Sequence, residues 1–135
     1  MLACLLCATM GFSQSGKDIT AGVHNFTLQW ISWDKPGKIM IKKNASGDWD
    51  VVGEQRSPDK TEFATIDGFL KQTSPTELEF TGIIRTQIKD INNGAVCERK
   101  GTYHFIAKGT RKYWRLKEMD NCEGNNVVDY IDIYF

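Results

Sequence analysis

From Val23 to Phe135, apolar and polar residues alternate with a period of two, and no stretch of this region carries a helical stripe. Successive side chains of a β-strand point to opposite faces, so this pattern predicts strands that each bury one face. Turn-forming Gly, Pro, Asn and Asp residues separate eight such segments. The predicted strands are residues 23–33, 38–43, 49–55, 62–72, 77–91, 96–108, 111–119 and 127–135.

The connections between these segments are short, which makes consecutive strands antiparallel neighbours. Asn93 and Gly94 between the fifth and sixth segments form a dipeptide typical of a tight hairpin. The last segment places Ile131, Ile133 and Phe135 on one face, and pairing with the first segment would remove the open sheet edge. The predicted fold is all-β: a single antiparallel eight-stranded up-and-down β-barrel of the calycin type, in preference to a sandwich, which usually needs longer crossovers.

The alternation also assigns residues to an inner face. The side chains expected inside are Phe26, Leu28, Trp30, Ile39, Ile41, Trp49, Val51, Ile66, Leu70, Leu78, Phe80, Ile84, Ile88, Tyr103, Phe105, Trp114, Leu116, Ile131, Ile133 and Phe135. Gly53, Gly68, Gly82 and Gly101 share this face, where they either curve the sheet or leave room for a ligand. Tyr113, Arg115 and Lys117 fall on the outer face, which we expect to be a solvated barrel wall.

The segment KGTRKYWRLKEMDNC, residues 108–122, mixes basic and aromatic residues and ends at a cysteine. A two-residue turn at residues 109–110 would place Phe105 opposite Trp114 and, further along the same hairpin, Cys97 opposite Cys122. Directly opposed residues at such a site have Cα atoms about 4.5 Å apart, at the short end of the disulfide range. We therefore predict a disulfide between these two cysteines.

The N-terminus is typical of a secretory signal. Residues 2–12 form an apolar run too short to span a bilayer, with small residues after it and no basic residue before it. We expect a signal peptide at residues 1–15 and one barrel domain at residues 16–135, with a core helix as the alternative for the apolar run. Removal of the signal leaves Cys97 and Cys122 as an even pair in a secreted or periplasmic protein.

Charge and motif content exclude several function classes. The chain has 17 basic and 17 acidic residues, so no net field recruits polyanions, and we expect no nucleic-acid partner and no transmembrane segment. The sequence carries no GxSxG, HExxH, P-loop or GxGxxG motif. His24 and His104 lie on different predicted strands, and Asp129 and Asp132 point to opposite faces. We expect no metal, no cofactor and no catalytic residue, and an enzyme is the third alternative for the function.

Longer polar loops are predicted at one end of the barrel, which we expect to be its mouth. Arg99 and Glu118 would be diagonal neighbours near this mouth, within reach of an ion pair. Two alternatives remain open there: a satisfied polar plug, or a ligand site with aromatic walls. The candidate ligand-binding residues are Trp30, Gln55, Arg99, Tyr103, Trp114, Glu118 and Asp129.

In strand count and turn pattern the whole mature chain resembles the small eight-stranded binding barrels, the lipocalin and avidin group, which implies a binding cavity. Residues 103–122, YHFIAKGTRKYWRLKEMDNC, are similar to a hairpin of the small barrel inhibitors of lysozymes. The leading hypothesis is an exported non-enzymatic barrel that binds a small apolar or amphipathic ligand or a glycan. The alternative is a protein-interaction module, such as a secreted hydrolase inhibitor of the lysozyme type, that acts through exposed loops. An open internal cavity would favour the first, and a filled barrel the second.

Overall fold

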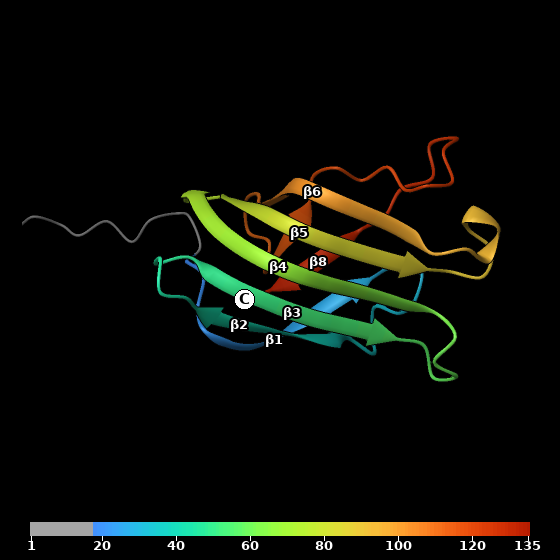
Figure 1. The fold of residues 1–135 in the computed structure, drawn as a ribbon, viewed down its shortest axis with the longest axis horizontal. Coiled ribbons are helices and arrows are strands. Elements are labelled where there is room, and N and C mark those ends of the chain that lie inside the picture. Colours follow the sequence, from blue (N-terminus) through green and yellow to red (C-terminus); the bar gives the residue numbers. More distant parts are fainter. Residues whose placement is uncertain (1–17) are drawn as a thin grey trace, which may run out of the picture.

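The computed structural model describes residues 18–135 as a closed barrel of eight antiparallel strands in chain order (Figure 1). The strands are β1 Gly22–Leu28, β2 Gly37–Lys43, β3 Trp49–Arg56, β4 Phe63–Ser74, β5 Glu77–Gln87, β6 Cys97–Ile106, β7 Tyr113–Leu116 and β8 Ile131–Tyr134. One 3-10 turn, η1 Asn92–Gly94, interrupts the β5–β6 connection. The predicted all-β barrel is confirmed, while the expected signal peptide at residues 1–15 lies outside the described residues.

The last strand closes the barrel as its apolar face predicts. β8 pairs with β1 through Phe26 and Ile133 and through Leu28 and Ile131, and all four side chains are buried. This pairing leaves neither terminal strand as a free sheet edge along the paired residues. Across residues 18–135 no helix is long and apolar enough to span a membrane.

The interior is filled by the side chains that the alternation placed there. The largest fully buried side chains are Trp114, Phe26, Phe80, Phe105, Leu28, Ile39, Ile66, Leu70, Leu78, Ile84, Leu116 and Ile131. Two predicted interior residues are wrong, because Trp30 is 42% exposed and Phe135 is 38% exposed. β1 ends at Leu28, whose carbonyl oxygen accepts the N–H groups of Ile31 and Ser32 at 3.0 and 3.3 Å. The chain turns there, and Trp30 leaves the strand face.

Gly68 and Gly82, two of the four inward glycines, bring strands together rather than leave space for a ligand, whereas a Cβ atom on Gly101 would meet only the Tyr103 hydroxyl, at 4.0 Å. Gly68 of β4 pairs with Gly82 of β5. A Cβ atom on Gly68 would lie 2.2 Å from the carbonyl oxygen of Thr81, and one on Gly82 would lie 2.8 Å from the ring of Phe80. Neither position tolerates a side chain, so these glycines allow the strong coiling that barrel closure needs.

The β6–β7 hairpin has the predicted turn but a different register. Arg111 donates its N–H to the carbonyl of Lys108 at 3.2 Å, which confirms a turn around residues 109–110. Phe105 pairs with Leu116 and not with Trp114, because the β7 side of the turn carries two more residues than the β6 side. A shift of two preserves which face each residue occupies, so Trp114 and Leu116 remain buried.

Longer connections gather at one end, as predicted for the mouth. Figure 1 shows the connections that follow β3, β5 and β7 at the end opposite to the β2–β3 and β4–β5 turns. The connection around Asn93 and Gly94 is not a two-residue hairpin, since β5 stops at Gln87 and β6 starts at Cys97. Positive φ angles at Asn92 and Asn93 support the tight η1 turn within it.

Candidate functional site

Four connections form one surface, which we call the loop face. They are residues 29–36 after β1, 57–62 after β3, 88–96 after β5 and 117–130 after β7. All four follow odd-numbered strands of an antiparallel barrel, so they meet at the same end (Figure 1). Function is commonly carried by loops that a rigid scaffold positions, which makes the loop face the first candidate site.

Neighbouring connections of the loop face are joined by hydrogen bonds. The backbone N–H of Lys89 donates to Oε2 of Glu62 at 3.0 Å, which joins residues 88–96 to residues 57–62. The backbone N–H of Asn92 donates to Oε2 of Glu123 at 2.9 Å, which joins the same connection to residues 117–130. These bonds hold three loops at fixed positions relative to one another.

The β3–β4 connection is also stabilised from within by Asp59. Its Oδ1 accepts the hydroxyl of Ser57 at 2.7 Å and both the backbone N–H and the hydroxyl of Thr61 at 3.1 and 2.8 Å. These hydrogen bonds, that from Ser57 first, hold the pKa of Asp59 below its ordinary value. An aspartate turn of this kind fixes the loop backbone without a buried core.

The β1–β2 connection is tied to residues 117–130 through Gln29. Its Nε2 donates to the carbonyl of Val128 at 2.9 Å, and its Oε1 accepts the N–H of Tyr130 at 2.7 Å. Nε1 of Trp30 also donates to the carbonyl of Val128, at 3.1 Å. With the bonds above, the four connections are joined in one series, from residues 29–36 through 117–130 and 88–96 to 57–62.

Gln55, one of the predicted ligand-binding residues, has its amide fully used within the protein. It is 1% exposed. Its Oε1 accepts the N–H of Leu28 at 2.7 Å, and its Nε2 donates to the carbonyls of Ser32 and Lys35 at 2.9 and 3.0 Å. Gln55 therefore holds the β1–β2 connection against β3.

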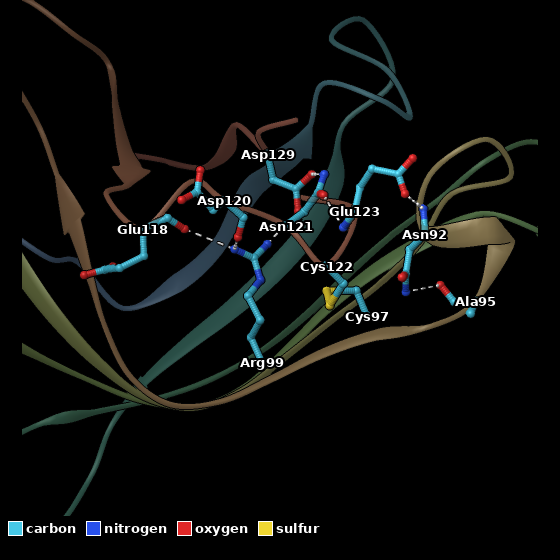
Figure 2. Close-up of a disulfide and its surroundings, with 10 residues drawn as sticks. All are labelled: Asn92, Ala95, Cys97, Arg99, Glu118, Asp120, Asn121, Cys122, Glu123 and Asp129. Atoms are coloured by element: carbon cyan, nitrogen blue, oxygen red, sulfur yellow. Dashed lines mark hydrogen bonds and ion pairs between the residues drawn. A yellow bond between two sulfur atoms is a disulfide. The ribbon is translucent and has the colours of Figure 1, made fainter. Parts of the chain in front are cut away.

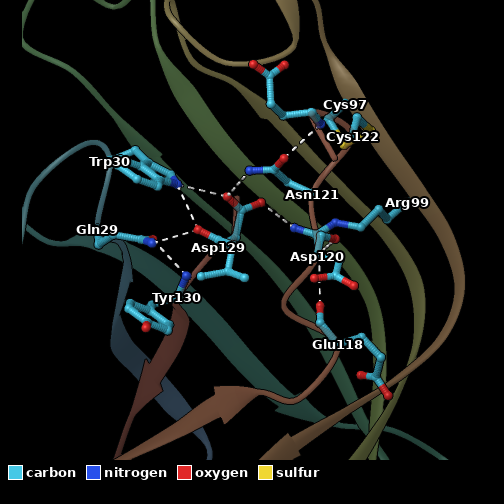
Figure 3. A network of polar contacts seen from close by, with 12 residues as sticks. Gln29, Trp30, Cys97, Arg99, Glu118, Asp120, Asn121, Cys122, Asp129 and Tyr130 are labelled. Atoms are coloured by element: carbon cyan, nitrogen blue, oxygen red, sulfur yellow. Dashed lines mark hydrogen bonds and ion pairs between the residues drawn. A yellow bond between two sulfur atoms is a disulfide. The ribbon is translucent and has the colours of Figure 1, made fainter. Parts of the chain in front are cut away.

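A buried polar network lies beneath the loop face, centred on Asp129 (Figure 3). Asp129 is 2% exposed, and its Oδ2 lies 2.6 Å from Nη2 of Arg99. Its Oδ1 accepts Nε1–H of Trp30 at 3.0 Å and Nδ2–H of Asn121 at 3.2 Å. The carboxylate has donors on both oxygens and one ion pair, as expected for a polar plug, while Nε of Arg99 is buried without a hydrogen-bond partner in the described residues.

The predicted ion pair between Arg99 and Glu118 is wrong. Nη1 of Arg99 donates to the backbone carbonyls of Glu118 and Asp120 at 3.0 and 3.3 Å, and its carboxylate partner is Asp129. The carboxylate of Glu118 turns to His104, accepting its backbone N–H at 2.8 Å and its Nδ1 at 2.7 Å. The chain leaves the strand ladder after Lys117, which redirects the next side chain.

Two opposing effects act on the Glu118 carboxyl. Partial burial raises its pKa, while the hydrogen bonds from the ring and backbone of His104 lower it, and the net pKa lies below the ordinary value. The His104 N–H would otherwise bond to the neighbouring strand, so this carboxylate replaces a strand partner at the end of the β6–β7 ladder.

The disulfide between Cys97 and Cys122 is confirmed, with Cα atoms 5.6 Å apart (Figure 2). It does not arise from the strand register that predicted it, because residues 118–122 have left the ladder where they reach Cys97. Asn121, next to the disulfide, accepts the N–H of Glu123 on Oδ1 at 2.8 Å while its Nδ2 donates to Asp129. The disulfide therefore anchors the same segment that carries the polar network.

A solvent-open groove of about 500 Å³ lies between β6 and the segment that follows β7. We call this groove the side window. Its lining residues are Arg99, Tyr103, Lys117, Glu118, Met119, Asp120 and Val128. Figure 2 shows the Arg99 side chain crossing from β6 toward residues 118–120.

The seven candidate residues do not share one cavity. Trp30, Arg99 and Asp129 meet in the polar network, whereas Tyr103 and Glu118 line the side window with Arg99. Gln55 lies elsewhere, under the β1–β2 connection. Trp114 packs against Phe135, with ring centroids 5.8 Å apart, beside a void of about 10 Å³ that holds roughly one water molecule.

An outer cluster around Arg115 was missed by the sequence reasoning. Its guanidinium makes two hydrogen bonds to Asp132, at 2.8 and 2.9 Å, and Asp132 is fully buried although it faces outward. The guanidinium lies 4.4 Å from the ring centre of Tyr130, 4.9 Å from that of Tyr113 and 5.9 Å from that of Trp33. Arg115 is therefore not a solvated wall residue. Aromatic residues at outward positions of the last two predicted strands could have indicated this cluster from the sequence.

The Arg115–Asp132 pair is electrostatically coupled. Hydrogen bonding to Asp132 raises the pKa of Arg115. Burial raises the pKa of Asp132, and the Arg115 guanidinium acts in the opposite direction without reversing it. Beside this pair, the hydroxyl of Thr27, which is paired with Asp132 across β1 and β8, is buried without a hydrogen-bond partner. The cluster packs on the outer face of the two short strands, β7 and β8.

Metal binding has no structural support in the described part of the chain. Residues 18–135 contain no group of three or more His, Cys, Asp or Glu side chains arranged to hold a metal ion. The disulfide is typical of proteins that reach an oxidising, extracytoplasmic compartment.

Comparison with known proteins identifies a family. The PM1083 family matches residues 11–135 of the chain. Uncharacterized protein PM1083 of Pasteurella multocida (strain Pm70) is 44% identical over 115 residues, which cover 84% of this chain and 72% of that relative. No solved structure matches the chain. The chain belongs to the PM1083 family.

Proposed function

We propose that this protein is a non-enzymatic binding module that recognises a protein partner through its loop face. The observation that carries the proposal is the series of hydrogen bonds that joins the four connections of the loop face into one surface. Binding to a preorganised surface avoids the entropy cost of ordering loops, so such a surface favours tight association.

Two partly exposed tryptophans are the expected energetic centre of this surface. Trp30 and Trp33 of the β1–β2 connection are 42% and 48% exposed. Trp30 is held by its Nε1–H bonds to Val128 and Asp129, and Trp33 lies near the Arg115 guanidinium. Tryptophan is strongly enriched among the residues that dominate protein–protein binding energy. Rings already fixed by such contacts lose little freedom on binding.

A ligand inside the barrel has less support. The void beside Trp114 has room for about one water molecule, and the interior positions are occupied by large apolar side chains. A drug-sized ligand generally needs a pocket of about 300 Å³ or more. Binding of a small apolar ligand or glycan therefore remains the second candidate, without an internal cavity of that size among residues 18–135 to favour it.

The partner class we propose is a secreted hydrolase. The disulfide favours an extracytoplasmic location for this chain, and residues 103–122 resemble a hairpin of lysozyme inhibitors. Inhibition through exposed loops requires only that the loop face covers the active-site cleft of the enzyme, so no catalytic residue is needed on this chain.

The test uses the full chain with its disulfide intact against a panel of secreted hydrolases, including the c-, g- and i-type lysozymes. At least one enzyme should bind and be inhibited, and replacing both Trp30 and Trp33 with alanine should weaken binding by about tenfold or more. Val52→Ala is the matched control, since Val52 is 58% exposed on the barrel wall, and it should change binding less than about twofold. A small molecule retained in native mass spectrometry, with no effect of the tryptophan replacements, would instead establish the ligand-binding alternative.

A further inference from the structure

The two edges of β6 are paired to very different extents. β5 pairs with β6 along the whole of Cys97–Ile106. β7 pairs with it only at Phe105 and Ile106, and one further bond runs from the N–H of Lys117 to the carbonyl of His104 at 2.7 Å. Most of the second edge of β6 therefore has no strand beside it within residues 18–135.

The register identifies which main-chain groups are left open. Backbone groups of alternate residues point to opposite edges of a strand, and His104 points toward β7. Glu98, Lys100 and Thr102 have the same orientation as His104, and their side chains are exposed. Their N–H and C=O groups have no hydrogen-bond partner in the described chain. They form a row of alternating donors and acceptors along the open edge of β6, whose Arg99 and Tyr103 line the side window.

The side window is closed at both ends and open in the middle. The Cys97–Cys122 disulfide closes one end, with a Cα separation of 5.6 Å, and the bonds of His104 to Lys117 and Glu118 close the other. Between these ends β6 curves away from residues 118–122, and the groove of about 500 Å³ fills the space (Figure 2).

The Arg99 side chain occupies part of the side window without using the open edge of β6. Arg99 spans the window, and Nη1 lies 3.0 Å from the carbonyl oxygen of Glu118 on the far side. Because the Arg99 side chain starts on the inner face of β6, it forms the floor of the window and leaves the edge free.

The chemistry of this open edge selects an extended main chain as the occupant. Donors and acceptors repeating at strand spacing are complementary to another strand, and neither a compact ligand nor a sugar repeats in this way. The half-buried side chains of Tyr103, Met119 and Val128 supply an apolar contact for a side chain of that strand. We propose that the β6 edge accepts, by strand addition, a short extended peptide segment of a partner protein, paired with Glu98, Lys100 and Thr102.

A proline at position 100 tests the proposal directly. Lys100→Pro removes the central N–H donor of the open edge and leaves the bonds between β6 and β5 in place, since proline is tolerated where the N–H faces outward. Lys100→Thr is the matched control, because it changes the side chain and keeps the N–H. The probe is a phage-displayed library of random linear octapeptides selected on the full chain with its disulfide intact.

Selected peptides should bind Lys100→Pro about tenfold more weakly than wild type, and Lys100→Thr within about twofold. In wild type, peptide binding should slow amide hydrogen exchange at Lys100 and Thr102 about tenfold or more, with little change at Arg99 and Gly101, whose amides face β5. The exchange measurement needs no variant, so it decides the question even where the proline variant fails to fold.

Three outcomes overturn the proposal. They are amides of Lys100 and Thr102 already protected in the free protein, selected peptides that bind Lys100→Pro as tightly as wild type, and a selection without any peptide that depends on the open edge. Trp33→Ala, which removes no hydrogen bond of the polar network, should leave peptide binding unchanged. The strand-addition site and the loop face are therefore tested independently of each other.

Discussion

Replacing Arg99 with methionine should destabilise the fold by about 3–5 kcal/mol, the cost of removing one partner from a buried ion pair. The Arg99 side chain is 10% exposed and that of Asp129 is 2% exposed, with 2.6 Å between Nη2 and Oδ2. The variant leaves the Asp129 carboxylate buried with only Trp30 and Asn121 as donors. It also removes the donors to the carbonyls of Glu118 and Asp120, so the segment after β7 loses its bonds to β6 across the window.

The chain offers a matched control of nearly the same geometry. Arg85 and Glu98 form an ion pair of 2.7 Å on the outer wall, with side chains 44% and 50% exposed. Solvent screens this pair and its side chains are mobile when unpaired, so Arg85→Met should lower the free energy of unfolding by less than about 1 kcal/mol. The difference between the two variants therefore combines the effect of burial with the loss of the two Arg99 bonds to backbone carbonyls.

Guanidinium denaturation followed by tryptophan fluorescence measures both variants, with an unchanged m-value as the condition for comparing midpoints. Asp129→Asn in the Arg99→Met background should restore part of the loss, because it removes the uncompensated buried charge. Equal destabilisation by Arg99→Met and Arg85→Met would refute the polar plug, as would a double variant no more stable than the single one.

Three further predictions concern the framework around the site. Reduction of the disulfide should lower the free energy of unfolding by about 3 kcal/mol, since the bond closes a loop of 25 residues. Denaturation with and without reductant measures this difference, and identical denaturation midpoints would contradict the prediction. Gly68→Ala should cost about 1–3 kcal/mol or more in thermal unfolding, because its Cβ would lie 2.2 Å from the Thr81 carbonyl, and an unchanged melting temperature would show that the strands move apart freely. The pKa of Glu118 in the folded protein lies below its ordinary value of 4.5, so its carboxylate stabilises the fold above pH 4.5, and this stabilisation is lost as the pH falls through the lowered pKa. Glu118→Gln should therefore lose less stability than wild type on acidification. Equal losses of the free energy of unfolding in both proteins between neutral and acidic pH would exclude this.

The fold was predictable because each strand buries one face. The alternation predicted eight strands, their antiparallel order and nearly all of the core, and the apolar last strand predicted closure onto β1. Strand ends were less predictable. The alternation of residues 29–33 continues that of β1, but the turn after Leu28 takes Trp30 out of the wall, and only the hydrogen bonds of the loop decide this.

The site was predicted in its residue types more than in its pairing. Arg99 and Asp129 were both candidates, but the expected partner of Arg99 was Glu118, derived from a register that assumed equal numbers of residues on both sides of the turn. Two additional residues on the β7 side invalidate that register, and turn-forming residues alone do not reveal such an insertion. The Arg115 cluster includes Trp33 of the β1–β2 connection, which approaches the outer wall. The alternation of residues along a strand assigns faces within that strand and cannot indicate where a loop residue lies.

The shortness of β7 and β8 connects these features. Each has four residues, against ten in β6, so the barrel wall lacks regular strand pairs on this side. The disulfide, the Arg99 bonds and the Glu118–His104 bonds cross the resulting gap in place of a ladder. Side chains and a disulfide hold the two sides together without using the edge groups of Glu98, Lys100 and Thr102. Stability and binding should therefore separate by position: Arg99→Met should weaken the fold, and Lys100→Pro should weaken only the capture of an added strand.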